Sequence, residues 1–345
     1  MKSAARDRVG AVVIGRNEGD RLARALEAAA HSVSRVVYVD SDSSDGSRER
    51  AAALGATVIH LDAPPFTPSR GRQVGLEALL EVQPDLEFVQ FIDGDCILDP
   101  DWVGRAVQHL EAQHEAAAVF GRRREERTEE SLYSRLMDVD WEHAPGWASH
   151  FGGDCLVRAS ALQAAGGWSG TTINAEDVDL SFRLRAGGWK LLRVSDPMTL
   201  HDVRMHHFGE YWRRALRAGY GYAEVGWRHR GGAGRLLLRR MASALLYGAL
   251  LPVVFVAGLP LAPLVSVAVA LVYLRLGLVL YRFARRRHAS RATALAYAAL
   301  NVACKPAACA GAMRFVIDRL QGRTRPRDAL IVYRDRGAGG DASRP

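Results

Sequence analysis

Cysteine is scarce in this chain, with four residues in 345, and no two of them are spaced as Cys-x-x-Cys. The spacing gives no sign of a disulfide framework and predicts reduced thiols in a cytosolic compartment. The chain also lacks an apolar leader, because the polar stretch 1–8 runs directly into the apolar stretch 9–14. We therefore expect the N-terminal part to stay on the side of the membrane where it is synthesised.

Charge and apolar residues are unevenly distributed along the chain. The net charge is +8, and 48% of the residues are hydrophobic, with the apolar residues concentrated in the last third. Much of the excess arginine flanks these apolar stretches. This placement favours a membrane surface and anionic phosphates as partners, and we expect no nucleic acid.

Short apolar runs alternate with helical patterns through the first hundred residues. The runs cover 11–14, 36–39, 57–59 and 88–92, and amphipathic stretches separate them. Continuous apolar runs are typical of strands buried on both faces. The pattern predicts an α/β fold with a mainly parallel sheet and helices on both faces.

Polar side chains follow three of these runs, namely Asn17 with Glu18, Asp40, and Asp93 with Asp95. Ligands of such sheets bind beyond the carboxyl ends of the strands. The first loop lacks the Gly-x-Gly-x-x-Gly of a dinucleotide site, so we expect Mg2+ or Mn2+ to bridge the carboxylates and a phosphate. The alternative is that Asp93-Gly94-Asp95 is a tight turn and that Asp40 caps one.

Four motifs succeed one another here: Val12-Val13-Ile14-Gly15-Arg16-Asn17-Glu18, Val39-Asp40-Ser41, Arg72-Gln73-x-Gly75 and Asp93-x-Asp95. Phe151-Gly152-Gly153-Asp154, Gly166-Gly167-Trp168 and Asn174-Ala175-Glu176-Asp177 follow them. In order and spacing these motifs resemble family 2 glycosyltransferases, which have the GT-A fold. The resemblance covers roughly residues 9 to 205 and implies a GT-A-type mixed sheet.

The resemblance also implies the chemistry of the site. Asp177, in the Glu-Asp motif at a helix start, is the base of an inverting single displacement, and the helix dipole favours its ionised form. Asp95 is the principal metal ligand, and Asp93 contacts the metal shell or the ribose. The other residues expected at the nucleotide-sugar site are Asn17, Glu18, Asp40, Arg72, Gly153 and Glu176. Alternatively, Glu176 and Asp177 only favour the helix start.

Other residues carry weaker signals. Many relatives have aspartate where this chain has Ser41 and asparagine where it has Gln73, so the nucleotide's base stays open. We expect a strand at 191–194, a turn at Asp196-Pro197 and then His201, the preferred third metal ligand over His206 and His207. Each of these histidines could instead be structural. The chain has no Gln-x-x-Arg-Trp, the mark of processive members, which favours addition of a single sugar.

The apolar stretch 245–281 is too long for one membrane span and sufficient for two short ones. Arginines precede and follow it, so both of its ends are expected in the cytoplasm. The predicted segments are a catalytic domain at 1–205, a basic juxtamembrane segment at 206–240, a transmembrane or re-entrant hairpin at 241–288, an interfacial or third membrane helix at 289–320, and a flexible basic tail at 321–345.

These features predict a membrane-attached glycosyltransferase with its catalytic domain on the cytoplasmic side of the cell membrane. It would move a sugar from a nucleoside-diphosphate sugar to a hydroxyl of a lipid-linked or membrane-embedded acceptor. The alternatives are a polyprenyl-phosphate glycosyl synthase, whose lipid-phosphate acceptor scarcely needs a base, and a membrane-tethered sugar-nucleotide binding protein without turnover.

Overall fold

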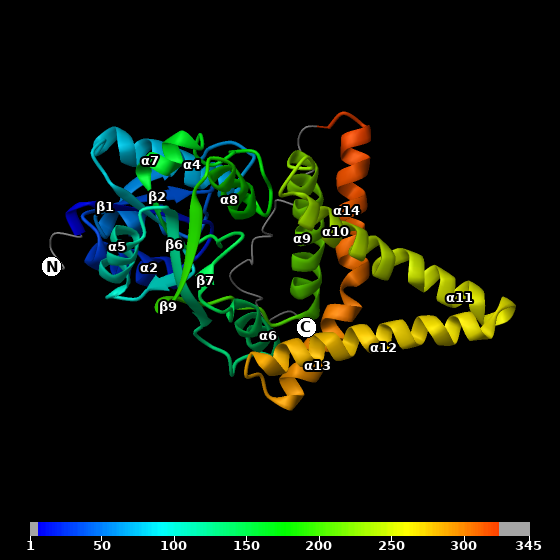
Figure 1. Ribbon diagram of the computed structural model, residues 1–345. Coiled ribbons are helices and arrows are strands. Elements are labelled where there is room, and N and C mark those ends of the chain that lie inside the picture. Colours follow the sequence, from blue (N-terminus) through cyan, green and yellow to red (C-terminus); the bar gives the residue numbers. More distant parts are fainter. Residues whose placement is uncertain (1–5, 324–345) are drawn as a thin grey trace, which may run out of the picture.

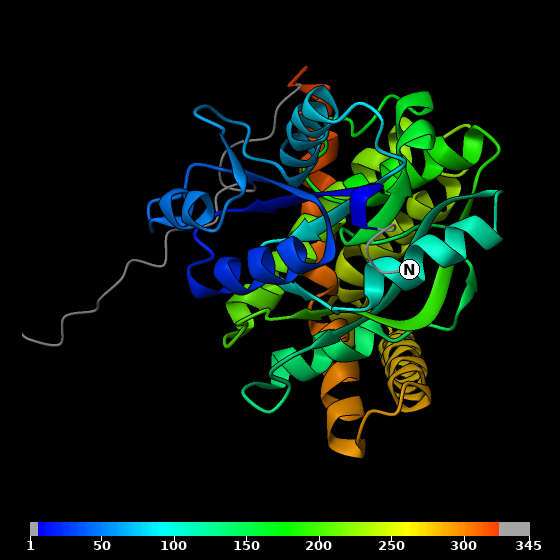
Figure 2. The same ribbon diagram turned by 90° about the vertical axis from the view of Figure 1, so that its left-hand side faces the viewer.

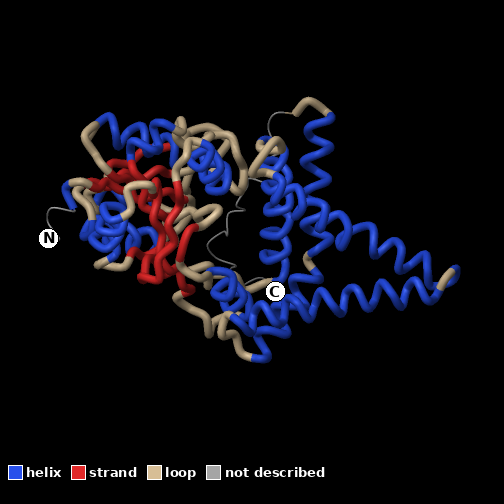
Figure 3. The backbone as a smooth tube through the Cα atoms, in the orientation of Figure 1, coloured by secondary structure: helices blue, strands red, loops and turns tan. Residues whose placement is uncertain are grey.

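A single mixed sheet organises the N-terminal two thirds of the protein. The computed structural model describes residues 6–323, in which nine strands form one sheet with the order β3-β2-β1-β4-β8-β6-β9-β5, while β7 pairs with β9. Helices cover both faces of this sheet, and a group of helices without strands follows it (Figures 1 and 3). The predicted α/β class with a C-terminal helical region is confirmed.

The parallel half of the sheet contains the four strands that the apolar runs predict. They are β3 (Thr57–His60), β2 (Arg35–Asp40), β1 (Val9–Gly15) and β4 (Phe88–Asp93). Gly15 pairs with Asp40 and Ile14 with Asp93, so these strands end at one edge. The connecting helices are α2 (Asp20–Ser32), α3 (Ser47–Ala53) and α4 (Pro68–Val82). The polar loops therefore converge at one edge of the sheet.

The remaining strands extend the sheet with mixed directions. They are β8 (Cys155–Arg158), β6 (Ala116–Glu125), β9 (Lys190–His201), β5 (Cys96–Leu98) and β7 (Gly146–Trp147). The helices around them are α5 (Trp102–Ala112), α6 (Leu132–Trp141), α7 (Ala159–Ala164) and α8 (Glu176–Ala186). The four cysteines are free and buried.

One expectation about the last strand is wrong. The predicted turn at Asp196-Pro197 does not form, because β9 continues to His201. The register between β6 and β9 shifts on both sides of Arg122, which pairs with Pro197, so the proline lies at an irregularity where no ladder hydrogen bond is needed from it. The strand then carries His201 into register with Cys96, one residue beyond Asp95.

The C-terminal helices form a group behind the sheet when the molecule is turned by 90° (Figure 2). They are α9 (Phe208–Arg228), α10 (Arg235–Leu245), the π-helical turn η1 (Leu246–Leu250), α11 (Leu251–Leu261), α12 (Pro263–Arg286), α13 (Arg291–Ala303) and α14 (Lys305–Leu320). The expected single segment at 289–320 is thus two helices that meet at Cys304. Of the expected tail 321–345, residues 324–345 lie outside the described part of the chain.

Two continuous helical stretches, Arg235–Leu261 and Pro263–Arg286, are long and apolar enough to cross a membrane by length and composition. Together they form a hairpin that points away from the sheet (Figure 1). Pro260 lies inside α11, and the chain reverses at Ala262. Leu261 and Leu264 at the tip are more than four-fifths exposed. A soluble environment leaves this surface unpaired, whereas lipid would cover it.

The hairpin is fastened to the catalytic part by α9, α13 and α14. On one side, Tyr297 of α13 donates a hydrogen bond to Asp140 of α6 (2.7 Å). On the other side, α9 and α14 run side by side (Figure 1). A Cβ on Gly311 would lie 2.0 Å from the carbonyl oxygen of Leu216, and one on Gly219 would lie 2.1 Å from that of Ala308. Only glycine permits this backbone approach.

Candidate functional site

Hydrogen bonds between loops hold the first part of the site. The amide of Gly94 donates to Ile14 (2.8 Å), which ties the loop after β4 to the end of β1. Asn17 has φ 55°, a conformation that asparagine tolerates better than most residues. Its amide donates to Ser43 Oγ (2.9 Å), and its Oδ1 accepts from the amide of Ser44 (2.8 Å). Asn17 therefore fixes the loop after β1 against the loop after β2.

Asp40 is fully buried at the end of β2. Its carboxylate accepts from the hydroxyl of Tyr38 (2.9 Å) and from the amide of Ser43 (2.8 Å). The nearest basic side chain is His60, whose Nδ1 lies 3.5 Å away. Asp40 thus shapes its own loop, as the turn-capping alternative describes, and it lies beside the other polar loops.

Arg72 joins the two acidic motifs. It extends from α4 with only 2% of its surface exposed. Its Nη1 donates to Glu176 Oε1 (2.6 Å), its Nη2 donates to Asp93 Oδ1, and its guanidinium stacks on the ring of Trp168 at 5.0 Å. Arg72 was expected to contact a base or phosphate. In the structure its guanidinium instead bonds two carboxylates of the protein, and it thereby fixes Asp93 relative to the Glu-Asp motif.

Gly153 permits this arrangement. A Cβ at this position would lie 2.4 Å from Nη2 of Arg72 and 3.0 Å from Oδ2 of Asp93. At the preceding position, Gly152, a Cβ would meet nothing within 4 Å. The glycine that the resemblance assigns to the sugar site thus serves first to let Arg72 and Asp93 meet.

Asp93 is also held from its other side. Arg123 of β6 lies with its Nη2 3.1 Å from Asp93 Oδ2 and 3.1 Å from Asp154 Oδ2. Asp154 accepts in turn from the amide of Asp93 (2.9 Å). Burial alone would raise the pKa of Asp93, but Arg72 and Arg123 lower it overall. Asp93 is therefore an ionised carboxylate committed to two arginines.

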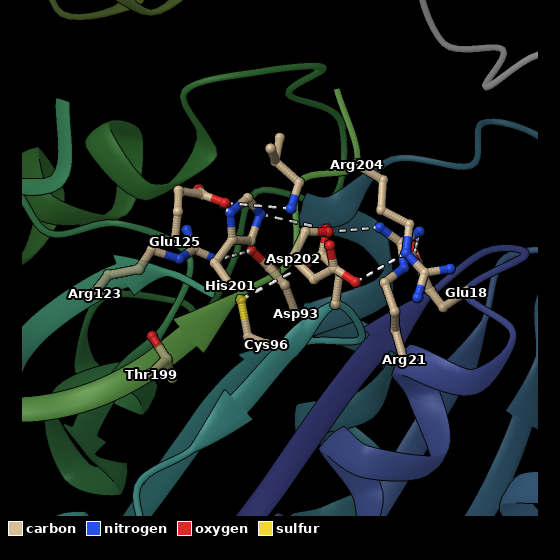
Figure 4. A network of polar contacts seen from close by, with 12 residues as sticks. Glu18, Arg21, Asp93, Cys96, Arg123, Glu125, Thr199, His201, Asp202 and Arg204 are labelled. Carbon is tan, nitrogen blue, oxygen red and sulfur yellow. Dashed lines mark hydrogen bonds and ion pairs between the residues drawn. The ribbon is translucent and has the colours of Figure 1, made fainter. Parts of the chain in front are cut away.

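His201 lies beside this cluster (Figure 4) and forms a separate pair with Asp95. His201 Nε2 lies 3.4 Å from Asp95 Oδ2, and its Nδ1 is hydrogen-bonded to the buried carboxylate of Glu125. Trp141 Nε1 also donates to Glu125 Oε1 (2.7 Å), which holds that carboxylate in place. A histidine oriented by a carboxylate on one nitrogen is the usual arrangement of a metal-binding imidazole.

Two groups of side chains within residues 6–323 bring potential ligands of a divalent cation together. The ligand atoms of Asp95, Cys96 and His201 all lie within 4.8 Å of one another, and so do those of Asp93, Cys96 and Asp154. In the second group, Arg123 Nη2 already lies 2.6 Å from Cys96 Sγ and 3.1 Å from each carboxylate. A metal between Asp93 and Asp154 would meet that positive charge. Among the described residues neither Asp95 nor His201 is paired with an arginine, so these two side chains, without Cys96, fit Mn2+ or Mg2+.

Glu18 lies next to this pair, at the end of β1. It pairs with Arg21, one of the basic residues beside it in Figure 4. Burial, followed by the charge of Asp95, raises the pKa of Glu18 to about 8. The carboxyl groups of Asp93, Asp95 and Glu18 therefore lie close together. Their negative charges repel one another, so positive charge beside them stabilises the ionised forms.

Asp177 stands at the first turn of α8. Its Oδ1 accepts from the amide of Val178 (2.8 Å). Burial, followed by the charge of Glu176, raises its pKa to about 7. The helix dipole favours the ionised form and would lower the pKa of Asp177, but desolvation outweighs that effect and raises the pKa. The carboxyl group is thus poised to take or release a proton near neutral pH.

A third acidic residue of this segment, Asp179, has a structural position that the sequence argument missed. It is fully buried, and Arg183 Nε donates to it at 3.0 Å. From α9 and the residue after it, Arg228 Nη1 lies 3.3 Å away and His229 Nε2 lies 2.9 Å away. These contacts fasten α8, which carries Asp177, to α9, the helix that leads towards the apolar hairpin.

Arg123, Glu125 and Asp154 were also missed. The run Arg122-Arg123-Arg124-Glu125 directly after an apolar stretch was a usable signal, because it places charges at a strand end. Asp154 stands directly after Gly152-Gly153, in a motif quoted only for its glycines. Of the residues assigned to the site from the sequence, Asp40, Asp93 and His201 end strands, Arg72 lies in α4, Glu176 and Asp177 lie in the first turn of α8, and the others lie in loops.

Comparisons with known proteins agree on one family. A sequence model described as "Glycosyl transferase family 2" matches residues 11–152, and one described as "Glycosyl transferase family group 2" matches residues 88–284. "Probable glucomannan 4-beta-mannosyltransferase 9" of Oryza sativa subsp. japonica is 33% identical over 130 residues, which are 34% of this chain and 24% of that protein. The chain thus spans about a quarter of the length of this plant relative.

Two further proteins match over more of the chain. "Succinoglycan biosynthesis protein ExoA" of Rhizobium meliloti (strain 1021) is 26% identical over 234 residues, 64% of this chain and 69% of that protein. The solved structure of mannosyltransferase PcManGT from Pyrobaculum calidifontis, in complex with GDP-Man and Mn2+, gives a TM-score of 0.62 at 18% identity and covers 91% of this chain and 88% of its own. This likeness confirms the GT-A fold.

Proposed function

This chain belongs to glycosyl transferase family group 2, and on that premise we propose that it is an inverting glycosyltransferase with a membrane-bound acceptor. It moves a sugar from a nucleoside-diphosphate sugar to a hydroxyl of a lipid-linked or membrane-embedded acceptor. The observation that carries this proposal is the Arg72 bridge. It holds the donor-side carboxylate Asp93 and the base-side residue Glu176 in one buried network, next to Asp177.

Asp177 acts as the base in this reaction. Its raised pKa, about 7, is matched to removal of a hydroxyl proton near neutral pH, because the ionised form is available and its proton affinity is higher than that of an ordinary aspartate. The acceptor hydroxyl loses its proton to Asp177 as its oxygen attacks the sugar carbon. The bond from that carbon to the diphosphate breaks on the opposite face, which inverts the configuration.

Asp95 and His201 would hold a divalent cation, Mn2+ or Mg2+, whose charge would offset the negative charge that develops on the departing diphosphate. Glu125 fixes the ring of His201 for this task. Asn17, Glu18 and Asp40 line the nucleotide side, while Arg72 and Arg123 keep Asp93 ionised beside it. Gly153 lets Arg72 and Asp93 meet beside the sugar.

The acceptor side faces a membrane in this proposal. The apolar stretches Arg235–Leu261 and Pro263–Arg286 enter the bilayer as a hairpin, and α13 and α14 lie at its surface. Arginines at both ends of the hairpin keep these ends, and the catalytic unit at 1–205, in the cytoplasm. The catalytic edge of the sheet then receives an acceptor that stays in the membrane.

Donor consumption by the full-length protein in detergent tests the proposal. We would supply GDP-, UDP- and dTDP-sugars with Mn2+ or Mg2+, beginning with GDP-mannose because the plant relative and the solved structure are named mannosyltransferases. We expect one donor to be consumed, Asp95→Asn to abolish its consumption, and Asp177→Asn to bind donor without transfer. Asp85→Asn, an exposed aspartate before β4, is the matched control.

Two results would select an alternative. Nearly full transfer by Asp177→Asn would indicate that the acceptor is a lipid phosphate, which scarcely needs a base. Donor binding without transfer or hydrolysis in the wild type, with every acceptor preparation, would indicate a binding protein. Absence of donor binding with metal present would refute the assignment of Asp93 and Asp95.

A further inference from the structure

A second group of charged side chains lies between the sheet and the C-terminal helices, outside the carboxylate site. It consists of Arg185 at the end of α8, Arg193 on β9, Arg240 on α10 and Lys305 at the start of α14, and we call it the cation cluster. His150 lies among them. Its pKa is lowered to about 4 by burial first and then by Arg240, Arg193, Arg185 and the neighbouring His143. Distant elements therefore bring positive charge to one place.

Within residues 6–323, no ion pair is found for any member of the cation cluster. The guanidinium of Arg193 stacks on the ring of Phe120 at 4.8 Å. Glu142, the acidic residue that acts on Arg193, is paired with Arg122 at 3.0 Å. Burial, followed by the charge of Arg287, lowers the pKa of Arg193 to about 10. Arg193 and Lys305 are half-buried, while Arg185 and Arg240 are exposed. Positive charges that repel one another at one place favour the arrival of an anion.

A row of aromatic contacts connects the cation cluster to the catalytic site. Phe120, under Arg193, lies 6.3 Å from Phe151, and Phe151 lies 6.3 Å from Trp168. The guanidinium of Arg72, the residue that bridges the two acidic motifs, lies 5.0 Å from the centre of the Trp168 ring. The cluster and the site of chemistry are thus neighbours separated by a few packed rings, and one extended substrate could reach both.

The apolar hairpin indicates where the cation cluster would lie relative to a membrane. Arg240 lies near the start of the first apolar stretch, and Arg287 directly follows the second. Both lie at the end of the hairpin nearer to the sheet, opposite the tip at Ala262 (Figure 1). Basic residues at this level of a membrane helix meet the phosphates of lipid headgroups.

We propose that the cation cluster binds the phosphate or diphosphate group of a lipid-linked acceptor, with Arg193 as its main ligand. This inference rests on the proposed function and names the acceptor's class. A guanidinium offers paired donors to phosphate oxygens, and Arg240 and Lys305 add charge from the membrane side. The lipid's phosphate is held here while the acceptor hydroxyl extends towards Asp177.

Binding of lipid phosphate to the full-length protein in detergent tests the proposal. The probes are mixed micelles with phosphatidate, micelles with diacylglycerol, which has the same chains without phosphate, and free inorganic diphosphate. We expect the wild type to bind phosphatidate micelles more tightly than diacylglycerol micelles. Arg193→Gln should weaken that binding about 10-fold or more, because a charge-assisted hydrogen bond is lost, and Arg193→Lys should recover part of it.

Arg35→Gln is the matched control, because Arg35 is an exposed arginine at the start of β2, outside the cation cluster. It makes the same change of charge and should leave phosphatidate binding unaltered. Equal binding by Arg193→Gln and the wild type, at equal melting temperature, would overturn the proposal. So would loss of inorganic diphosphate binding in Arg193→Gln when phosphatidate gives no advantage over diacylglycerol, since the site would then hold a soluble phosphate.

The test also separates this inference from the proposed function. Phosphatidate binding requires no donor, so it is measured whether or not a sugar is transferred. A wild type that binds phosphatidate through Arg193 but consumes no nucleoside-diphosphate sugar would refute the glycosyltransferase proposal and leave the phosphate site standing. A wild type that consumes donor, with no effect of Arg193→Gln on phosphatidate binding, would do the reverse.

Discussion

Gly153→Ala offers a sharp test of how the catalytic network is built. The added methyl group would lie 2.4 Å from Nη2 of Arg72 and within 3.0 to 3.2 Å of both carboxylate oxygens of Asp93. Arg72 is buried and bonded to Asp93 and Glu176, so its guanidinium cannot swing aside without breaking an ion pair. Overpacking of this kind costs about 1–3 kcal/mol in stability, and a displacement near 1 Å at a reacting group reduces turnover about 100-fold.

The assay compares kcat/KM for donor consumption and the melting temperature in detergent for Gly153→Ala and Gly152→Ala. Gly152 is the matched control, because a Cβ there meets nothing within 4 Å and the backbone change is the same. We expect Gly152→Ala to behave as the wild type and Gly153→Ala to lose about 100-fold in kcat/KM. Equal activity of the two variants would refute the conclusion that Arg72 and Asp93 must meet at that glycine.

Three further predictions concern the proposed base, the carboxylate that orients His201, and the residue that precedes α8. Since Asp177 acts when ionised and has a pKa of about 7, kcat/KM should rise about tenfold per pH unit below that value and level off above it; a profile flat from pH 6 to 8 would contradict this. Glu125→Gln should weaken Mn2+ binding about 10- to 100-fold, measured by the Mn2+ signal in electron paramagnetic resonance, because His201 loses its orienting carboxylate, and unchanged affinity would refute that role. Ala175 has φ 64°, so Ala175→Gly should raise the free energy of unfolding by about 1 kcal/mol in urea titration, and a decrease would show that no strain is stored there.

Local signals in the sequence were sufficient for the parallel half of the fold. The runs at 11–14, 36–39, 57–59 and 88–92 all lie inside strands. β1, β2 and β4 are buried almost throughout, because a strand covered on both faces must be apolar, whereas β3 is an edge strand with half-buried and exposed residues. The later strands depend on partners far along the chain. Pro197 has the signature of a turn, yet the irregular pairing of β6 with β9 leaves its missing amide without consequence. Proline marks the end of a strand only where a ladder hydrogen bond is required.

The properties of the site also divide into those that short motifs in the sequence reveal and those that depend on residues far along the chain. Asp93, Asp95, Glu176 and Asp177 belong to short motifs, so their identity and order were visible in the sequence. Their charge states were not visible, since these depend on desolvation and on partners from other elements. Arg123 illustrates this, because it is 30 residues from Asp93 in the chain and yet decides which carboxylates can hold a metal.

The connection between the membrane hairpin and the base could not be predicted from the sequence, because it depends on glycines that no motif contains. Gly221 of α9 has no side chain where a Cβ would lie 2.6 Å from the carbonyl oxygen of Asn174, in the loop before Glu176. On α9 two residues earlier, Gly219 makes the same kind of close contact with α14. His229, directly after α9, is also bound to Asp179 of α8. The helix α9 therefore packs against α14 on one side and against the loop before Asp177 on the other. In the proposed membrane-bound enzyme, seating the hairpin in a bilayer would therefore constrain α9, and α9 would in turn constrain Asp177, the proposed base.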